Sequence, residues 1–246
     1  MTSPFRVELT ATGSARAVHV TETNELRAAL DMLGLHPPQR TVVVVGGAAG
    51  LKAMDRLRPV FAVGIAPVME KYGAVGVDGG TRSGVMRLFG EARSATQATF
   101  PLVGVVAAGS VKLPPEQVSL HAETVLEPNH THFVFVPGQK WGAEAPWIAR
   151  TATVLAGAAP SITVLVNGGQ IAYSDVQRSV ETGRRVVVIA GSGRTADVFV
   201  DALAGAPADH LAVALVKSGL IGSVPMDEPA VLAESLTAAL RGSAAK

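Results

Sequence analysis

The sequence predicts an α/β fold, built as a doubly wound, mainly parallel sheet with helices on both faces. Short runs of Val and Ile alternate along the chain with segments in which apolar residues recur at helical spacing. The Val/Ile runs are apolar throughout instead of alternating with polar residues, which indicates parallel strands buried on both faces. Several of these runs end at a pair of glycines, as strands do where the chain turns into a covering helix.

Residues 1–38 are expected to form a small N-terminal extension made of a hairpin and a helix. Two segments rich in β-formers, 5–9 and 16–20, flank a turn centred on Gly13. Apolar residues at helical spacing then predict a helix over 22–33, and Pro37-Pro38 closes the extension. The main domain is expected to cover residues 39–246.

The main domain is expected to repeat the order strand, turn and helix, which is typical of a Rossmann-like sheet. Its expected strands are 42–45, 74–77, 102–107, 132–136, 162–166, 185–190 and 212–216. Its expected helices are 51–72, 85–92, 147–155, 176–182, 195–203 and 229–240. Pro59 and Pro67 should kink or divide the first of these helices. Residues 108–131 form a long irregular connection, and such connections usually carry a function or contain a further element.

The amino-acid composition excludes several kinds of partner and of chemistry. The chain has 246 residues, of which 48% are hydrophobic and 17% charged, with a formal net charge of +1. It contains no run of Lys or Arg, so neither nucleic acid nor a membrane surface is expected as a partner. Cysteine is absent, which excludes disulfides, thiol nucleophiles and cysteine metal sites. No signal peptide and no apolar run of membrane-spanning length is visible, so we expect a soluble, cytoplasmic protein.

The glycine turns at the strand ends are the strongest functional signal. One of them, Gly191-Ser192-Gly193-Arg194, follows the apolar run 186–190 and precedes a predicted helix. Free N–H groups and the helix dipole attract phosphate at such a turn, and a guanidinium can bind phosphate with two hydrogen bonds. Turns of the same kind follow three other strands, which together suggest a nucleotide-sized anionic ligand at the carboxyl ends of the strands. The candidate binding residues are Gly46, Gly47, Gly79, Gly80, Thr81, Arg82, Ser83, Gly84, Gly168, Gly169, Gly191, Ser192, Gly193, Arg194 and Thr195.

Each turn also has a simpler interpretation, as a tight strand-to-helix connection whose arginine reaches solvent. The sequence contains neither a Walker loop nor the Gly-x-Gly-x-x-Gly fingerprint of dinucleotide-binding sheets. Gly46-Gly47 is the weakest candidate because Ala48 and Ala49 follow it without a polar group. Asp197 is interpreted as a first-turn residue that favours the helix dipole.

The pair His130 and His132 invites a metal interpretation, because His-x-His can place both imidazoles on one face of a strand. Glu127 is the only carboxylate close to them in the sequence, and no third ligand is apparent. We therefore favour hydrogen-bonding histidines that shape a loop over a metal site.

Three further residues could line a ligand site. Asp175 lies six residues after Gly169, where its carboxylate could reach the mouth of the site or simply lie on a helix surface. Trp141 and Trp147 could stack on a base, although half-buried packing is the commoner role of tryptophan.

Five segments, taken together, resemble a known superfamily. They are VGVDGGTRSGVMRLFGEA at 75–92, LEPNHTHFVFV at 126–136, WGAE at 141–144, VLVNGG at 164–169 and RRVVVIAGSGRTADVF at 184–199. In this order they resemble the SLOG superfamily, the Rossmann-like group of Smf/DprA and the Lonely Guy phosphoribohydrolases. Within it they are most similar to the LSDAT family, which includes the N-terminal domain of melastatin-type TRP channels.

The resemblance implies a pocket for a nucleotide derivative such as ADP-ribose, NAD or a nucleoside monophosphate, with no further cofactor required. It also implies a tendency to form homo-oligomers. Two phosphate loops are implied, the first made of Gly79, Gly80, Thr81, Ser83 and Gly84, and the second of Gly191, Ser192, Gly193 and Arg194.

The resemblance bears on catalysis through a single carboxylate. Lonely Guy enzymes carry Pro-Gly-Gly-x-Gly-Thr-x-x-Glu, in which the Glu acts on the bond between ribose and base. Asp175 falls at the Glu position here, while Ile171 and Ala172 replace the Gly-Thr pair. The first expected function is therefore binding or sensing of an NAD-like or ADP-ribose-like nucleotide. Cleavage of an N-glycosidic bond by Asp175 is the alternative, and a structural partner module of a larger assembly is the third hypothesis.

Overall fold

A computed structural model describes residues 3–10, 13–47, 54–111 and 125–241. Most of the irregular connection expected at 108–131, and the start of the helix expected at 51–72, lie outside these residues. None of the helices in the described part of the chain combines the length and the apolar character needed to cross a membrane.

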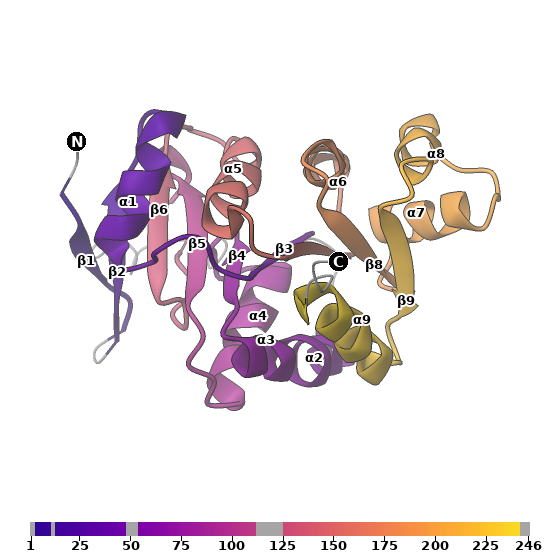
Figure 1. The fold of residues 1–246 in the computed structure, drawn as a ribbon, viewed down its shortest axis with the longest axis horizontal. Helices are drawn as coiled ribbons and strands as arrows, with labels where there is room; N and C mark the ends of the chain where they lie inside the picture. Colours follow the sequence, from indigo (N-terminus) through magenta and orange to yellow (C-terminus); the bar gives the residue numbers. More distant parts are fainter. Residues whose placement is uncertain (1–2, 11–12, 48–53, 112–124, 242–246) are drawn as a thin grey trace.

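The described residues form one nine-stranded sheet covered by helices (Figure 1). The strands are β1 (Phe5–Glu8), β2 (Ser14–His19), β3 (Thr41–Gly46), β4 (Val75–Asp78), β5 (Leu102–Ala107), β6 (His132–Val136), β7 (Ser161–Val166), β8 (Arg185–Ala190) and β9 (Ile221–Pro225). The α-helices are α1 (Leu26–Leu33), α2 (Met54–Pro59), α3 (Ala66–Tyr72), α4 (Gly84–Ala95), α5 (Ala145–Ala156), α6 (Gln170–Glu181), α7 (Thr195–Leu203), α8 (His210–Val216) and α9 (Pro229–Arg241). Shorter helical segments are η1 (Thr23–Glu25), η2 (Val60–Ile65) and η3 (Ala108–Ser110).

The order of the strands places a topological switch in the middle of the sheet. The order is β1-β2-β6-β5-β4-β3-β7-β8-β9, and all neighbouring strands are parallel except β1 and β2. The chain moves outward from β3 to β6 and then returns to add β7 on the other side of β3. Because the connections after β3 and β7 leave in opposite directions, a crevice opens between them at the carboxyl ends of the strands. The predicted α/β fold is confirmed.

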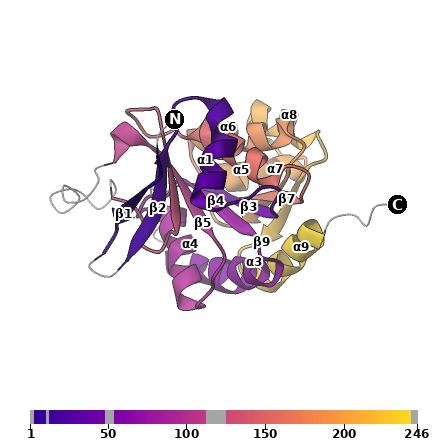
Figure 2. The same cartoon turned by 60° about the vertical axis from the view of Figure 1, so that its left-hand side comes forward.

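Two apolar layers sandwich the sheet, which explains the unbroken Val runs. Val42 and Val44 of β3 pack under the helices α2, α3, α4 and α9, whereas Val43 and Val45 pack under the opposite helix layer. Figure 2 shows these two helix layers on either side of the sheet, with α1, α5, α6, α7 and α8 forming the second one. A strand with both faces covered needs apolar residues at every position.

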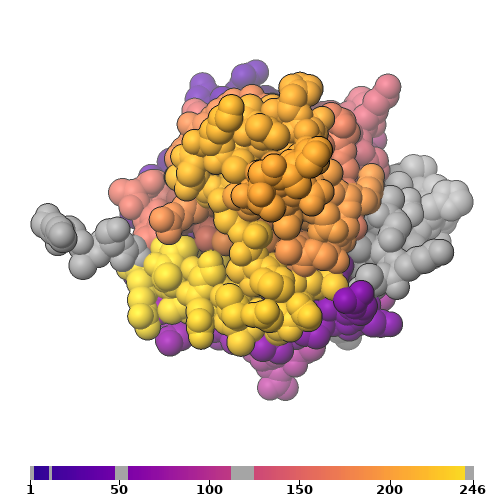
Figure 3. Space-filling model, turned by 90° about the vertical axis from the view of Figure 1, so that its right-hand side faces the viewer, coloured from indigo at the N-terminus to yellow at the C-terminus, as the bar shows by residue number. Residues whose placement is uncertain are grey.

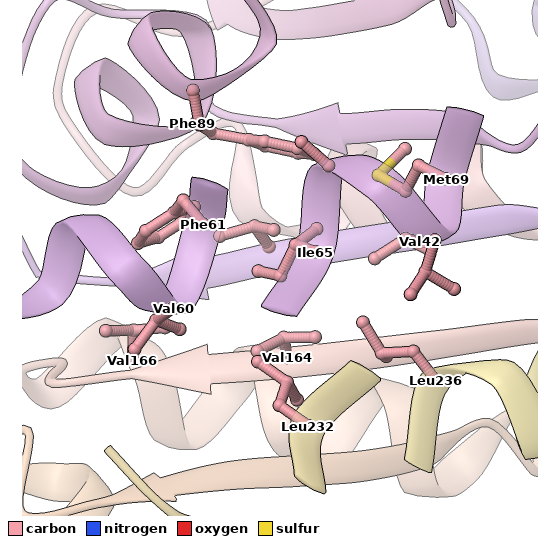
Figure 4. Packing of buried hydrophobic residues seen from close by; sticks show 14 of the residues in the cluster. Val42, Val60, Phe61, Ile65, Met69, Phe89, Val164, Val166, Leu232 and Leu236 are labelled. Atoms are coloured by element: carbon pink, nitrogen blue, oxygen red, sulfur yellow. The ribbon is translucent and has the colours of Figure 1, made fainter. Parts of the chain in front are cut away.

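The helix expected over 51–72 is divided near its two prolines into an α-helical, a π-helical and a second α-helical segment, which follow one another without a loop. The segment η2 is π-helical, and it connects α2, which ends at Pro59, to α3, which has Pro67 in its first turn. Phe61 and Ile65 of η2 belong to the same core cluster as Phe89 of α4, and Phe61 packs against the Phe89 ring (Figure 4). Pro67 occupies the first turn of α3, where no N–H donor is needed, whereas Pro59 lies inside α2 directly before the winding widens.

The expected strand at 212–216 is wrong. These residues belong to helix α8, which Asp209 caps by accepting a hydrogen bond from the N–H of Leu211 at 2.9 Å. The last strand is instead β9, where Ile221 and Val224 are buried while Gly222 and Ser223 are exposed. An apolar run of six residues fits a helix or a strand equally well, and the N-cap decided for the helix.

The N-terminal segment joins the sheet directly. Its hairpin is confirmed, because β1 and β2 pair in antiparallel register, and β2 then pairs in parallel with β6. At the other end of the sheet, the atoms of the α7–α8 region (orange) lie above those of α9 (yellow) in Figure 3. Both helix layers therefore reach the β9 end of the sheet, at the opposite edge from the hairpin.

Candidate functional site

A cavity of about 350 Å³ lies at the topological switch. The ends of β3, the turn after β4, the segment before α5, the first turns of α4 and α6, and the residue before α7 all contribute to it. Its walls are Val44, Val45, Gly46, Gly47, Gly79, Met86, Trp141, Glu144, Ala145, Ile148, Gly169, Gln170, Ile171, Ala172, Asp175 and Arg194. The turns that the sequence singled out at four strand ends thus meet around one cavity or directly behind it.

The glycines after β3 permit a close approach of two strands. Gly46 is paired with Val166 of β7, and a Cβ at Gly46 would collide with the Val166 carbonyl. A Cβ at Gly47 would lie 2.9 Å from the side-chain Oδ1 of Asn167. Both glycines line the cavity, so the turn with the weakest sequence signal lies at its centre.

The turn after β4 faces the cavity through Gly79 alone. Three of its N–H groups donate within the protein: that of Gly80 to Asp78 Oδ1, that of Arg82 to the Val125 carbonyl and that of Ser83 to the Thr81 carbonyl. Gly80, which has φ of 65°, packs against Gly104 of β5. Thr81 and Ser83 are buried, Gly84 begins α4, and the Arg82 side chain is exposed. Apart from Gly79, the residues of the first expected phosphate loop therefore do not line the cavity.

The turns after β7 and β8 are bonded to each other. Asn167 donates its N–H to Ser192 Oγ at 2.8 Å and its side-chain amide to the Ser192 carbonyl at 2.8 Å. Thr195 Oγ1 donates to the Gly169 carbonyl at 3.1 Å. Asp197 accepts the N–H of Gly191, which gives it a more specific role than the general dipole effect. Gly168, Gly191, Ser192, Gly193 and Thr195 thus brace two turns of which Gly169 and Arg194 reach the cavity.

Arg194 is held over the cavity by an uncommon backbone conformation. It has φ of 55°, and Asn167 in the adjacent turn has φ of 58°, a region that side-chain-bearing residues seldom adopt. A Cβ at Gly169 would lie 3.0 Å from Arg194 Nη2, so the guanidinium lies across the first turn of α6. Backbone strain of this kind is concentrated at ligand-binding sites.

Two carboxylates share the cavity with Arg194. Asp175 is 9% exposed, and its Oδ1 is buried without a hydrogen-bond partner among the described residues. Burial and, to a smaller extent, the charge of Glu144 raise the pKa of Asp175 to about 7 against the opposing charge of Arg178. Glu144, just before α5, accepts the N–H of Gly142 at 2.9 Å. The cavity therefore contains an acidic group whose ionised form lacks compensation.

Behind the β4 turn lies a buried ionic cluster. His130 donates from Nε2 to Asp78 Oδ1 and from Nδ1 to Glu127 Oε2, each at 2.8 Å. Burial lowers the pKa of His130, but Asp78 and Glu127 outweigh it and raise the pKa to about 9. Gly90 of α4 leaves room for the Glu127 carboxylate, since a Cβ there would collide with it. His130 thus shapes the loop, as the sequence predicted.

His132 has a different environment from His130. Its Nδ1 lies 2.7 Å from Thr131 Oγ1, and burial together with Arg16 lowers its pKa to about 4. Within the described residues, no group of three His, Asp or Glu side chains is arranged to hold a metal ion. The two histidines therefore do not act together.

Several wall residues were not candidates in the sequence. Met86 and Ile148 lie in segments that the sequence predicted only as helices, and Glu144 was noted only as part of the segment WGAE. Trp141 is 42% exposed at the cavity wall, whereas Trp147 packs against the core. The sequence had already named Trp141 as a possible stacking residue, and the match of WGAE to a family segment was the signal that could also have identified Glu144.

Comparison with known proteins agrees with this architecture. A family model described as "SLOG in TRPM, prokaryote" matches residues 39–234. The chain is 27% identical over 223 residues to "Transient receptor potential cation channel subfamily M member 2" of Mus musculus, covering 76% of this chain and 15% of that protein. It is also 27% identical over 221 residues to "Transient receptor potential cation channel subfamily M member-like 2" of Nematostella vectensis, covering 74% of this chain and 14% of that protein. The chain thus spans a small part of these channel proteins. With a family match over most of its length, it belongs to the prokaryotic SLOG-in-TRPM family.

Proposed function

We propose that the chain binds a nucleotide derivative of the NAD or ADP-ribose kind in the cavity at the topological switch. The observation that carries the proposal is the convergence of Arg194 and the turns after β3, β4 and β7 on one cavity. Phosphates would lie against Arg194 and the first turns of α4 and α6, where N–H groups and helix dipoles favour negative charge. The apolar walls, Val44, Val45 and Ile148 among them, would enclose the sugar or base.

The site's construction supports binding more directly than it supports a structural role. Arg194 has a positive φ, although a glycine at this position would make the same connection with less strain. The hydrogen bonds between the turns after β7 and β8 fix that arginine before any ligand arrives. Preorganisation of this kind lowers the entropy cost of binding.

Titration calorimetry with ADP-ribose, NAD and AMP tests the proposal. Arg194→Ala should weaken binding by about tenfold or more, because a charge-assisted contact to phosphate is lost. Arg185→Ala is the matched control, since Arg185 is exposed at the opposite end of the same strand, β8. Absence of binding to the folded protein, or an equal loss in both variants, would contradict the proposal.

A second candidate function is cleavage of the bond between ribose and base. The observation that favours it is the buried and unpartnered Oδ1 of Asp175 in the cavity wall. In its ionised form Asp175 would stabilise the ribosyl cation that develops as the C1′–N bond breaks, and water would then add to C1′. Chromatography of the products would detect release of adenine from AMP. Asp175→Asn should abolish that release while AMP binding persists, and absence of turnover in the unmodified chain would exclude this function.

A further inference from the structure

The charged groups of the cavity do not balance one another. Among the residues that the structure describes, three charged side chains line its walls, namely Glu144, Asp175 and Arg194. A dianionic diphosphate would face one cation and two carboxylates, which is a poor match for a purely anionic ligand. The two carboxylates therefore need a separate explanation.

Of the two carboxylates, Asp175 is the one with fewer interactions that stabilise its charge. Glu144 is satisfied in part by the N–H of Gly142, whereas Asp175 Oδ1 has no partner within the described residues. Burying an ionised carboxylate without a partner is costly, and such a group attracts a cation that can reach it. Arg178, one turn further along α6, is directed to Ser174 Oγ at 3.3 Å and does not line the cavity. The missing cation is thus one that a ligand could bring.

The surrounding wall suits a flat ring. Trp141 and Ile171 are exposed at the cavity wall, and Ile171 lies close to Gly142, which has φ of 93°. The face of an indole ring attracts a cation, and an aliphatic side chain can pack against a flat ring. These apolar groups come from the same two segments as Glu144 and Asp175, namely the stretch before α5 and the start of α6.

We infer that the preferred ligand carries a positively charged pyridinium ring, as oxidised NAD does, and that Glu144 and Asp175 bind this ring while Arg194 binds the phosphates. The inference rests on the proposed nucleotide function and names the part of the ligand that the carboxylates select. ADP-ribose lacks the ring, and the nicotinamide ring of NADH is neutral. Neither of them compensates Asp175.

The charge pairing makes binding depend on pH in a defined direction. Within the described part of the chain, the charged groups that approach Asp175 or share its cavity are Glu144 from the segment before α5, Arg178 on α6 and Arg194 before α7. A pyridinium ring beside Asp175 lowers the pKa of its carboxyl, so binding releases a proton near neutral pH. Affinity for oxidised NAD should rise between pH 6 and pH 8, whereas affinity for NADH and ADP-ribose should stay constant or fall.

Calorimetry at pH 8 with oxidised NAD, NADH and ADP-ribose tests the inference on the full chain. EDTA is present, because a metal ion bridging the phosphates could also neutralise the carboxylates. Oxidised NAD should bind about tenfold tighter than NADH, since an ion pair in a partly desolvated site is worth about one factor of ten or more. Asp175→Asn and Glu144→Gln should each reduce this preference.

Asp201→Asn is the control, because Asp201 is exposed on α7 outside the cavity. Retained NADH binding shows that a variant is folded, and Glu144→Gln carries the test where Asp175→Asn does not fold. Equal affinity for oxidised NAD and NADH would overturn the inference and leave the proposed function intact. Absence of binding by all three nucleotides would overturn both.

Discussion

Asp175 and His130 are both buried ionisable side chains with raised pKa values, but for opposite physical reasons. Burial and the neighbouring Glu144 disfavour the charged form of Asp175, and its pKa is about 7. Two carboxylates favour the charged form of His130 against the effect of burial, and its pKa is about 9. The charge of Asp175 in the cavity wall is therefore unfavourable, whereas the charge of His130 stabilises the fold behind the cavity.

Asp175 should destabilise the ligand-free protein as the pH rises. Its folded pKa of about 7 exceeds the ordinary value of 3.8 for an Asp side chain, so the native state binds more protons than the unfolded state between these values. Native stability from this group is therefore greatest below about pH 4 and is lost progressively up to about pH 7. Asp175→Asn should raise the free energy of unfolding by about 4 kcal/mol at pH 8 and by about 1–2 kcal/mol at pH 5.

Urea unfolding of the ligand-free protein at these two pH values measures the effect. Asp201→Asn, which replaces an exposed carboxylate, should change the free energy of unfolding little at either pH. A stability gain that is the same at pH 5 and pH 8 would contradict the assignment.

His130 should stabilise the protein most when it is protonated. Its folded pKa of about 9 lies above the ordinary value of 6.5 for a His side chain, so its contribution is complete below about pH 6.5 and is lost as the pH rises through 9. His130→Gln leaves Asp78 and Glu127 buried without their cation and should cost about 3–5 kcal/mol at pH 7.

His132→Gln is the comparison for this variant, because His132 lies two residues away and burial and Arg16 lower its pKa to about 4. That variant should cost less than about 1.5 kcal/mol, the scale of one hydrogen bond between neutral groups. Thermal unfolding at pH 7 checks both values. Equal losses in the two variants would show that the cluster around His130 is not held by charge.

At the scale of single elements, two adjacent glycines in the turn after β4 have different roles. A Cβ at Gly79 would meet only Met86, at 3.8 Å, and Gly79 lines the cavity. A Cβ at Gly80 would lie 2.8 Å from the Cα of Gly104, and Gly80 has φ of 65°. The first position is open to a side chain in the folded state, and the second is not.

Gly79→Ala should therefore weaken nucleotide binding and leave stability within about 1 kcal/mol, because the added methyl group enters the cavity without strain. Gly80→Ala should lower the free energy of unfolding by about 3 kcal/mol through overpacking and backbone strain. Calorimetric titration and denaturant unfolding of both variants separate the two effects. A Gly79→Ala variant that binds as well as the unchanged chain would place the ligand elsewhere.

The sequence predicted elements well where a pattern was long and poorly where it was short. The strand runs from β3 to β8 were recognisable because burial on both faces leaves only apolar residues. Helix α8 was mistaken for a strand, because its six apolar residues carry no period and the cap at Asp209 was not weighed. Strand β9 was missed because three of the five positions of this edge strand are exposed, which leaves no apolar run to recognise.

At the scale of the whole molecule, the location of the cavity followed from the sequence but its chemistry followed only in part. The carboxyl ends of parallel strands lie at the same edge of the sheet, so the turns that follow these strands must lie near one another. The contacts that decide which turn residues face the cavity are long-range, such as that between Asp78 and His130, 52 positions apart. No local pattern reveals them, which is why Gly80 and Ser83 were grouped with Gly79.

A ligand at the switch should connect the two halves of the sheet, and hydrogen exchange can detect this. One wall of the cavity belongs to β3, β4 and α4, and the other to α6 and Arg194. A saturating nucleotide at about 100 times its Kd stabilises the native state by about 2.7 kcal/mol. Amides of Gly79 and the first turn of α4 should therefore gain protection together with those of residues 169–172. Amides of β1 and β2 lie in the hairpin far from the cavity, so the ligand does not touch them and they should gain less protection than the cavity amides. Protection confined to one wall would mean that the ligand binds outside the crevice, because a molecule at the switch must touch both.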